Sequence, residues 1–351
     1  METSTIKCAL YTWGANSFGQ LGLKNAEDQV KPQCAEYGQE ARTLRAITGG
    51  GGHSALITES GELLVCGQNH KGQLGLGHVS EVMTFQLCQL PGSRTVQQVS
   101  CGWDFTIILT DDGHVLACGS NAFGQLGISP QTQYTAQPLL ITSLREPVIS
   151  VAAGLRHALA VTGLDQEPAK CVTAGSAHCA CLTVSGEVFL WGSNKHGQLC
   201  RKETFLPLPT ALDRSLLNGE RVSAIHSGWT HLIAQTESGR VLTWGRASYG
   251  QLGRQVTTND STESSLPSEV RTLHGASQIA CGSEHNLAIV GNQVFSWGWN
   301  EHGMCGDGSL CDVIQPQPIP DLQNAKALLI GCGAGHSLAL CCLKNSEDTG
   351  S

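Results

Sequence analysis

Apolar residues occur along this chain in short runs that end at glycine, asparagine or other turn-forming residues. The run HSALITES (53–60) leads through a glycine into a second run, GELLVCG (61–67), and this arrangement predicts a β-hairpin. A proline-containing stretch such as LPLPTALD (206–213) and a returning run such as RVSAIHSG (221–228) complete the unit. No segment keeps a helical period over a useful length. The pattern therefore predicts an all-β protein whose units each contain about four short strands, as propeller blades do.

Two phrases recur with this pattern. The first is glycine, two free positions, histidine and an apolar run, and its copies are 51 to 54 residues apart except at one place. The histidines of the first phrase are His53, His157, His178, His231, His285 and His336, and Phe105 takes the same position in a degenerate copy. The second phrase, as in YTWGANSFGQLG (11–22), interleaves with the first and occurs six times. A fixed period of about 50 residues indicates a propeller or a solenoid array.

The spacing between copies of the two phrases is irregular at one place. His157 and His178 are only 21 residues apart, and Gly119 and Gly192, which begin consecutive copies of the second phrase, are 73 apart. Both intervals leave about 32 residues missing from the fourth repeat, so we interpret the chain as a shortened version of a seven-bladed protein. We expect a β-propeller of seven sectors whose truncated fourth blade keeps two strands, from about Val148 to Thr162. The alternative is a closed six-bladed ring with a bulged loop over 162–170.

The two ends of the chain predict how the ring closes. The chain begins with a copy of the second phrase and ends with GAGHSLAL (333–340), a copy of the first. Together the two half-units make one blade. We therefore expect the N- and C-terminal strands to pair, which removes the open edges of a linear array. Residues 1–343 are assigned to a single propeller domain and residues 344–351 to a short polar C-terminal tail.

Composition narrows the classes of function. Charged residues make up 14% of the chain and the net charge is −8, which argues against a nucleic-acid-binding surface. No secretion signal or apolar segment of membrane-spanning length occurs in the sequence. We expect a monomer that does not insert into membranes and that works in the cytoplasm or the nucleus.

The sixteen cysteines do not follow a metal-binding pattern. No Cys-x-x-Cys pair occurs, and Cys66 and Cys118 stand where other repeats have tryptophan. They behave as small buried hydrophobes. We therefore predict that all sixteen are reduced, and that the protein has no metal site and no cofactor.

The two interleaved phrases resemble the regulator of chromosome condensation repeat family over essentially the whole chain, from about Tyr11 to Leu343. The stretches SGWTHL (227–232), CGSEHNLAI (281–289) and WGWNEHGMCGDG (297–308) further resemble a branch of the family associated with guanine nucleotide exchange and secretion. The resemblance implies a seven-bladed propeller that engages a small GTPase through one face. The chain departs from the chromosome regulator itself, because it has no basic N-terminal cluster and no room for an inserted hairpin.

The resemblance also directs attention to the two free positions between glycine and histidine. The residues that it implies for partner binding are Trp103, Asp104, Arg156, Trp229, Thr230, Ser283 and Glu284. Trp103 and Trp229 are aromatic residues of the kind that dominate interfaces. We expect Asp104 and Glu284 to lie on the partner face rather than in the core. The alternative is that these candidates are ordinary solvated loop residues with no role in partner binding. The histidines recur once per blade, so we interpret them as structural.

Two hypotheses of function remain open at this point. One is a guanine nucleotide exchange factor, or regulator of small GTPases, in secretion and vesicle trafficking, with a small GTPase or an exocyst-type component as its partner. The other is a scaffold of the same fold that binds proteins without promoting exchange. An enzyme that breaks covalent bonds is not expected, because the sequence has no phosphate-binding loop of the G-x-x-x-x-G-K-[ST] type and no G-x-S-x-G elbow.

Overall fold

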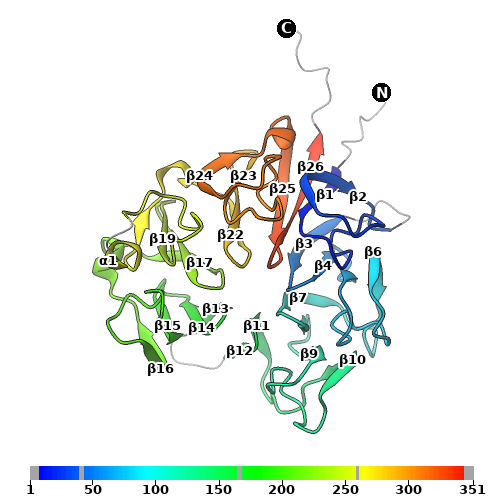
Figure 1. Cartoon of the computed structure of the whole chain (residues 1–351). Helices are drawn as coiled ribbons and strands as arrows, with labels where there is room; N and C mark the ends of the chain where they lie inside the picture. Colours follow the sequence, from blue (N-terminus) through cyan, green and yellow to red (C-terminus); the bar gives the residue numbers. More distant parts are fainter. Residues whose placement is uncertain (1–7, 39–42, 164–167, 258–260, 344–351) are drawn as a thin grey trace, which may run out of the picture.

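The computed structural model describes residues 8–38, 43–163, 168–257 and 261–343 of the chain. The predicted tail, 344–351, lies outside the described residues. Six antiparallel sheets of four strands each are arranged around a central axis as the blades of a β-propeller (Figure 1). A separate sheet of two strands lies between two of the blades. The all-β propeller is thus confirmed, and the number of complete blades is that of the six-bladed alternative.

The blades are built from consecutive strands, which follow one another from the axis outward. The first blade contains β3 (Leu44–Gly49), β4 (His53–Thr58), β5 (Leu63–Gly67) and β6 (Val82–Cys88), and the second contains β7 (Val96–Cys101), β8 (Phe105–Thr110), β9 (Val115–Ser120) and β10 (Tyr134–Leu140). The next three blades contain β13 (Ala169–Ala174), β14 (His178–Thr183), β15 (Val188–Ser193) and β16 (Phe205–Ala211); β17 (Val222–Ser227), β18 (His231–Thr236), β19 (Val241–Gly245) and β20 (Ser268–Glu269); and β21 (Gln278–Cys281), β22 (His285–Val290), β23 (Gln293–Gly298) and β24 (Val313–Pro318). The last blade joins both ends of the chain and contains β25 (Ala325–Cys332), β26 (His336–Leu343), β1 (Cys8–Gly14) and β2 (Gln29–Ala35). The short helices are η1 (Arg214–Leu217), α1 (Ser261–Ser264), η2 (Arg271–Leu273) and η3 (Pro320–Leu322).

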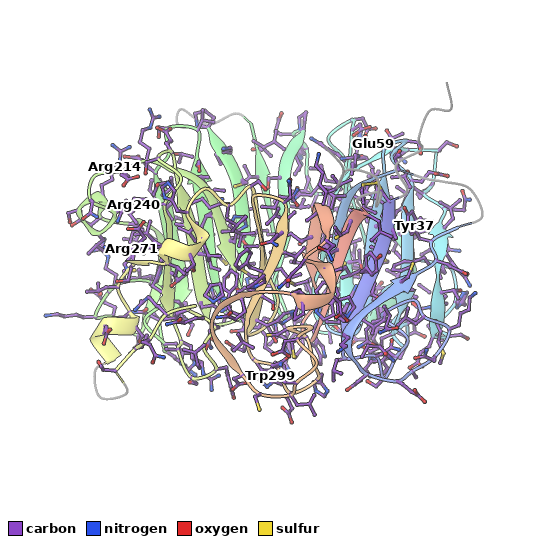
Figure 2. The ribbon with its side chains drawn as sticks, turned by 90° about the horizontal axis from the view of Figure 1, so that it is seen from above. Tyr37, Glu59, Arg214, Arg240, Arg271 and Trp299 are labelled. Carbon is purple, nitrogen blue, oxygen red and sulfur yellow. A yellow bond between two sulfur atoms is a disulfide. The ribbon has the colours of Figure 1, made fainter. Side chains whose placement is uncertain are left out.

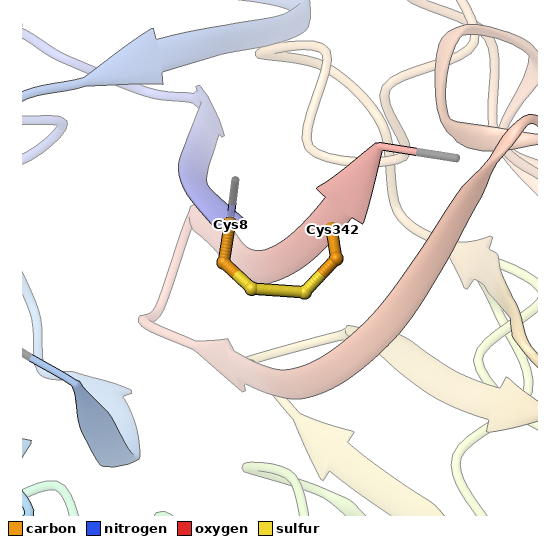
Figure 3. The surroundings of a disulfide bond; sticks show 2 residues. All are labelled: Cys8 and Cys342. Atoms are coloured by element: carbon orange, nitrogen blue, oxygen red, sulfur yellow. A yellow bond between two sulfur atoms is a disulfide. The ribbon is translucent and has the colours of Figure 1, made fainter. Parts of the chain in front are cut away.

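The last blade closes the ring, as the split half-units predict. Strand β1 from the N-terminus pairs antiparallel with β26 from the C-terminus, and Leu10 faces Leu340 in the register. The same register places Cys8 opposite Cys342, and a disulfide joins them with their Cα atoms 4.0 Å apart (Figure 3). The prediction that all sixteen cysteines are reduced is therefore wrong for this pair. Linear sequence analysis missed it because the two residues are 334 positions apart and meet only once the ring closes.

The two-stranded sheet lies where the repeat spacing is short. It consists of β11 (Val148–Ala153) and β12 (Ala158–Thr162), which pair antiparallel with Val148 opposite Thr162. These are the two strands that the sequence predicted for the fourth repeat. Strand β11 contacts β7 of the preceding blade and β13 of the following one. Strand β12 pairs with β11 alone, so its outer edge carries no neighbouring strand within the described residues.

Large apolar side chains fill the space between neighbouring blades. Trp13, Trp244 and Trp297 occupy the same repeat position and are fully buried. Each indole N–H donates to a backbone carbonyl of a neighbouring blade's second phrase, as Trp244 Nε1 does to Gln198 O at 2.9 Å. Cys66 occupies the equivalent position in its own blade, and its thiol lies 3.5 Å from Gln20 O. This confirms that such cysteines are small buried substitutes for tryptophan.

The glycine that ends each Gly-Gln-Leu-Gly turn adopts a left-handed conformation. Its φ is 68° at Gly22 and 67° at Gly253, a region that favours glycine because it has no Cβ. Cys200 occupies this position after β15 and has a φ of 54°. A residue with a Cβ in this region is strained by about 1–2 kcal/mol, so the turn at Cys200 carries a strain that the glycines of the other repeats avoid.

Candidate protein-interaction face

The loops between glycine and histidine surround one mouth of the central axis. They precede β4, β8, β12, β14, β18, β22 and β26, and we call the surface that they form the histidine-loop face. The Gly-Gln-Leu-Gly loops lie on the same face, since His53 at the start of β4 pairs with Gly67 at the end of β5. In Figure 2 this face carries Trp299, whereas Glu59 and Arg214 lie on the opposite side.

Backbone hydrogen bonds tie these loops to one another around the axis. Ser176 N donates to Trp229 O at 3.0 Å, Trp229 N donates to Ser283 O at 2.8 Å, and Ala334 N donates to Gly50 O at 2.9 Å. The loops enclose a cavity of about 80 Å³ that is lined mainly by glycine, alanine and cysteine. These bonds cross-link the backbone at the mouth of the axis, so the loops form one platform.

The glycine of the first phrase is required by its own histidine. A Cβ added to Gly50 would lie 2.3 Å from His53 Cε1, and one added to Gly228 would lie 2.1 Å from His231 Cε1. The imidazole thus packs closely against the glycine three residues before it, where a Cβ would not fit. This contact explains why the two residues recur together.

The histidines connect neighbouring blades. His336 Nε2 lies 2.8 Å from Ser54 Oγ, and the Ser54 hydroxyl donates to Gln20 O at 2.6 Å. Because the hydroxyl hydrogen is used in that bond, Ser54 accepts from Nε2–H, so the imidazole is the neutral Nε2–H tautomer. The same contact to the next blade is made by His53 with Thr106, His178 with Ser227, His231 with Asn286 and His285 with Ser337.

Burial keeps these imidazoles neutral. Desolvation lowers the pKa of His53, His178 and His285 to about 3 and that of His336 to about 4. His157 is the exception in exposure, because it is only half-buried and its Nε2 faces Cys179 Sγ at 3.3 Å. No group of three or more metal-ligating side chains is assembled anywhere in the described residues. The contacts support the structural interpretation of the histidines.

We expect His285→Ala to lower the free energy of unfolding by about 1–3 kcal/mol, because it removes a buried hydrogen bond to Ser337 and leaves a void. Urea titration followed by circular dichroism measures the change. His302→Ala is the matched control, since His302 is a half-buried surface histidine paired with Asp28. Equal losses in the two variants would contradict the structural role of the repeated histidines.

Trp103 and Trp229 meet on the histidine-loop face. Their ring centroids are 5.6 Å apart with the planes inclined at 56°. They come from the loops before β8 and β18, which belong to blades that are not neighbours, so the pair lies across the mouth of the axis. Trp103 remains 42% exposed. The structure thus joins these two predicted residues into one accessible aromatic cluster.

Arg156 and Asp104 add charges to the histidine-loop face. Arg156 is exposed, and its guanidinium lies 4.8 Å above the ring of the exposed Phe123. Asp104 is half-buried, and desolvation raises the pKa of its carboxyl, whereas the charges of His70 and Lys71 act in the opposite direction. Both residues lie on the face where the sequence predicted them.

The other three predicted residues are buried. Glu284 is 6% exposed and Thr230 is 8% exposed, and the Thr230 hydroxyl donates to the Glu284 carboxylate at 2.8 Å. Gln251 Nε2 donates to the same carboxylate at 2.6 Å. Ser283 is 1% exposed and its hydroxyl donates to Ala334 O. The expectation that Glu284 lies outside the core is therefore wrong, because neighbouring loops supply donors that fold its carboxylate inward.

A second group of side chains on this face escaped sequence analysis. The guanidinium of Arg246 lies 4.9 Å above the ring of Tyr249, and Tyr249 contacts Trp299 with centroids 6.2 Å apart. Trp299 in turn meets the ring of His302 edge-on at 5.7 Å. One signal could have found Tyr249 and His302: the position before the glycine of Gly-Gln-Leu-Gly is aromatic or basic in every copy. These residues are Phe18, Lys71, Phe123, His196, Tyr249 and His302.

Comparison with known families decides the identity of the repeats. The family described as regulator of chromosome condensation (RCC1) repeat matches residues 9–57, 60–109, 112–161, 185–235, 238–289 and 292–340. The chain belongs to the RCC1 repeat family. Consecutive matches to this model are separated by two residues, except at 162–184, where 23 residues intervene. A second model with the same description matches 169–198, so the stretch that neither model matches is 162–168.

Individual RCC1-repeat proteins resemble the chain along most of its length. The secretion-regulating guanine nucleotide exchange factor of Bos taurus is 48% identical over 392 residues, which cover 97% of this chain and 84% of that protein. The protein of the same name from Mus musculus is 46% identical over 394 residues, which cover 97% and 85%. Both matched stretches are longer than the 351-residue chain, so the relatives carry segments that this chain lacks.

A solved RCC1-type structure shares the fold. Prp20p from Saccharomyces cerevisiae superposes with a TM-score of 0.84 over 98% of this chain and 94% of its own, at 20% identity. Its published description concerns binding to Gsp1p and histones. No helix within the described residues is both long and apolar enough to cross a bilayer.

Proposed function

We propose that this protein binds a small GTPase through its histidine-loop face and promotes release of the bound guanine nucleotide, in a pathway of secretion or vesicle trafficking. The observation that carries the proposal is the accessible Trp103–Trp229 pair on a hydrogen-bonded platform. Rigid aromatic side chains on a face that also carries the charged residues Arg156 and Asp104 have the composition of an interface hot spot. The names of the relatives supply the nucleotide exchange and the secretion.

Nucleotide exchange requires no bond-breaking residues in the factor. Such a protein acts by binding the nucleotide-free GTPase more tightly than the nucleotide-bound form, so a shaped surface is sufficient. We place the work in the cytoplasm or the nucleus, with the protein acting as a monomer. An exocyst-type component is the other partner that the trafficking role suggests.

We infer in addition that the sheet of β11 and β12 is a shortened fourth blade in a ring of seven. Three observations support this inference. The innermost strand β11 contacts both β7 and β13. The gap between consecutive family matches is 23 residues at 162–184 and two residues elsewhere. The relatives contain additional residues. The chain then keeps the angular plan of a seven-bladed ring while lacking two outer strands.

A direct test is the release of fluorescent GDP from a panel of small GTPases with and without this protein. We expect faster release from at least one GTPase, and Trp103→Ala should weaken binding to it by about 1–3 kcal/mol. Leu310→Ala is the matched control, because Leu310 is 59% exposed and lies outside the glycine–histidine loops. Binding without faster release would favour the scaffold hypothesis. No binding to any GTPase, or equal effects of the two substitutions, would contradict the proposal.

A further inference from the structure

The truncated fourth repeat leaves an unpaired strand edge in the middle of the ring. In each complete blade a third strand pairs with the strand that follows the histidine loop, as β15 pairs with β14. Strand β12 is the counterpart of β14, and only β11 pairs with it within the described residues. Its outer edge therefore presents a row of backbone donors and acceptors of the kind that binds another strand.

The missing strand also leaves apolar side chains partly uncovered. Every residue of β4 and β8 is buried, whereas none of the residues of β12 is. The missing strand also explains why His157 is only half-buried. In the following blade Gly192, at the end of β15, lies opposite His178, whereas no third strand lies opposite His157. The exposed surface of β12 is thus a feature of this repeat alone.

A groove runs along this edge toward the next blade. Its volume is about 360 Å³, and its lining carries no charged residue. Leu159 and Val161 of β12 form one side, and Phe189 and Trp191 of β15 form the other. Apolar walls beside a free backbone edge fit an uncharged extended polypeptide, which would bury side chains and satisfy the edge at once.

Trp191 identifies what the groove lacks. It occupies the repeat position of Trp13, Trp244 and Trp297, but it is only half-buried. In those three residues the indole N–H donates to a carbonyl in a neighbouring blade's second phrase, and the fourth repeat has no second phrase. Among the described residues the Trp191 indole has no hydrogen-bond partner, so the groove offers a donor as well as apolar surface.

The position of the groove and of the free edge of β12 favours an extended segment over a folded partner. Strands β11 and β12 fill the two inner positions of a sheet, while the neighbouring blades continue outward by two more strands (Figure 1). The free edge is therefore recessed between β9–β10 and β15–β16. A second copy of this chain would meet the outer strands before its own sheet edge reached β12.

We propose that the groove between β12 and β15 binds an extended, uncharged, apolar protein segment by antiparallel strand addition. The six complete blades define the register: a glycine of the added strand lies opposite His157, and the following turn offers a carbonyl to Trp191. The ligand is thus a peptide that resembles the third strand and glycine turn of an RCC1 repeat. This proposal does not rest on the proposed function, although the glycine turn of the added segment would lie on the histidine-loop face.

The test uses the full chain and a synthetic peptide that copies residues 62–74, which contain β5 and its turn and have no tryptophan, with Glu62 and Lys71 replaced by glutamine so that the peptide is uncharged. In the peptide, Cys66 is replaced by alanine. We expect saturable binding, a blue shift of tryptophan emission that is lost in Trp191→Phe, and at least tenfold slower amide exchange over β12. A control peptide with prolines in place of Leu64 and Val65 is expected not to bind.

Matched protein variants sharpen the result. Val161→Asp places a charge in the groove and should weaken peptide binding at least tenfold, whereas Val184→Asp, at a residue 62% exposed outside the groove, should leave binding unchanged. Equal binding by both variants would overturn the proposal. Protection of another edge such as β6 would also overturn it, as would a dimer that protects β12 without peptide, because a second copy would then be the occupant.

Discussion

Acidification from pH 7 to pH 5 is expected to remove most of the stability of this protein. The pKa of His53, His178 and His285 is about 3, and that of His336 about 4, because burial disfavours the charged imidazole. An unfolded histidine titrates near 6.5. Below that pH the unfolded chain binds protons that the folded chain does not, so stability is complete above pH 6.5 and falls as the pH decreases toward 4.

The size of the effect follows from linkage. At pH 5 each of the four histidines contributes a loss of about 2 kcal/mol, and together they contribute about 8 kcal/mol. A loss of that size is comparable with the ~5–15 kcal/mol that stabilises an ordinary domain. Urea titrations at pH 7.5, 6 and 5 measure it, in a range where carboxylates of ordinary pKa stay ionised in both states.

His285→Gln provides the control for this prediction. It removes one buried titrating group, so the dependence of the unfolding free energy on pH should weaken by one proton between pH 6 and 5. The absolute stability at pH 7.5 also falls, but the slope is the diagnostic quantity. A slope equal to that of the original chain would mean that His285 already binds its proton in the folded state.

The repeat spacing made most of the fold predictable. Each blade repeats the same glycine–histidine contact and the same tryptophan position, so strand order and ring closure follow from one unit. The two strands kept by the fourth repeat could be predicted because both are intact in the sequence. The disulfide between Cys8 and Cys342 could not, since neither residue belongs to a repeated position and each looks like an ordinary strand residue.

The interaction face was less predictable than the fold. Position in the repeat placed Trp103 and Trp229 on the correct loops, but their contact depends on the width of the ring. The burial of Glu284 depends on Thr230 and Gln251, which come from other loops, and no periodicity within one repeat encodes these contacts. Whether a side chain at such a position is exposed depends on the loops of neighbouring blades, so it cannot be predicted from the sequence of one loop.

Trp244→Ala is expected to lower the free energy of unfolding by about 3–5 kcal/mol, which is typical for removal of a fully buried tryptophan. The substitution leaves a cavity between two blades and an unpaired carbonyl at Gln198. Trp191→Ala is the matched control at the same repeat position, and it should cost only about 1 kcal/mol, because that side chain already faces the open groove. Circular dichroism in urea measures both, independently of the tryptophan emission that the substitutions alter.

The difference between the two tryptophans should disappear when the fourth blade is completed. A copy of residues 59–90, inserted after Thr162, supplies the turn, a third strand and a fourth strand, and brings a carbonyl like that of Gln73 to the Trp191 indole. The completed chain should be more stable than the original, since it covers the edge of β12 and the groove beside it. In that chain Trp191→Ala should cost about as much as Trp244→Ala, in the range of ~3–5 kcal/mol. If the insertion leaves the cost of Trp191→Ala near 1 kcal/mol, the sheet of β11 and β12 is not a shortened blade, and the ring is a six-bladed one that only accommodates two additional strands.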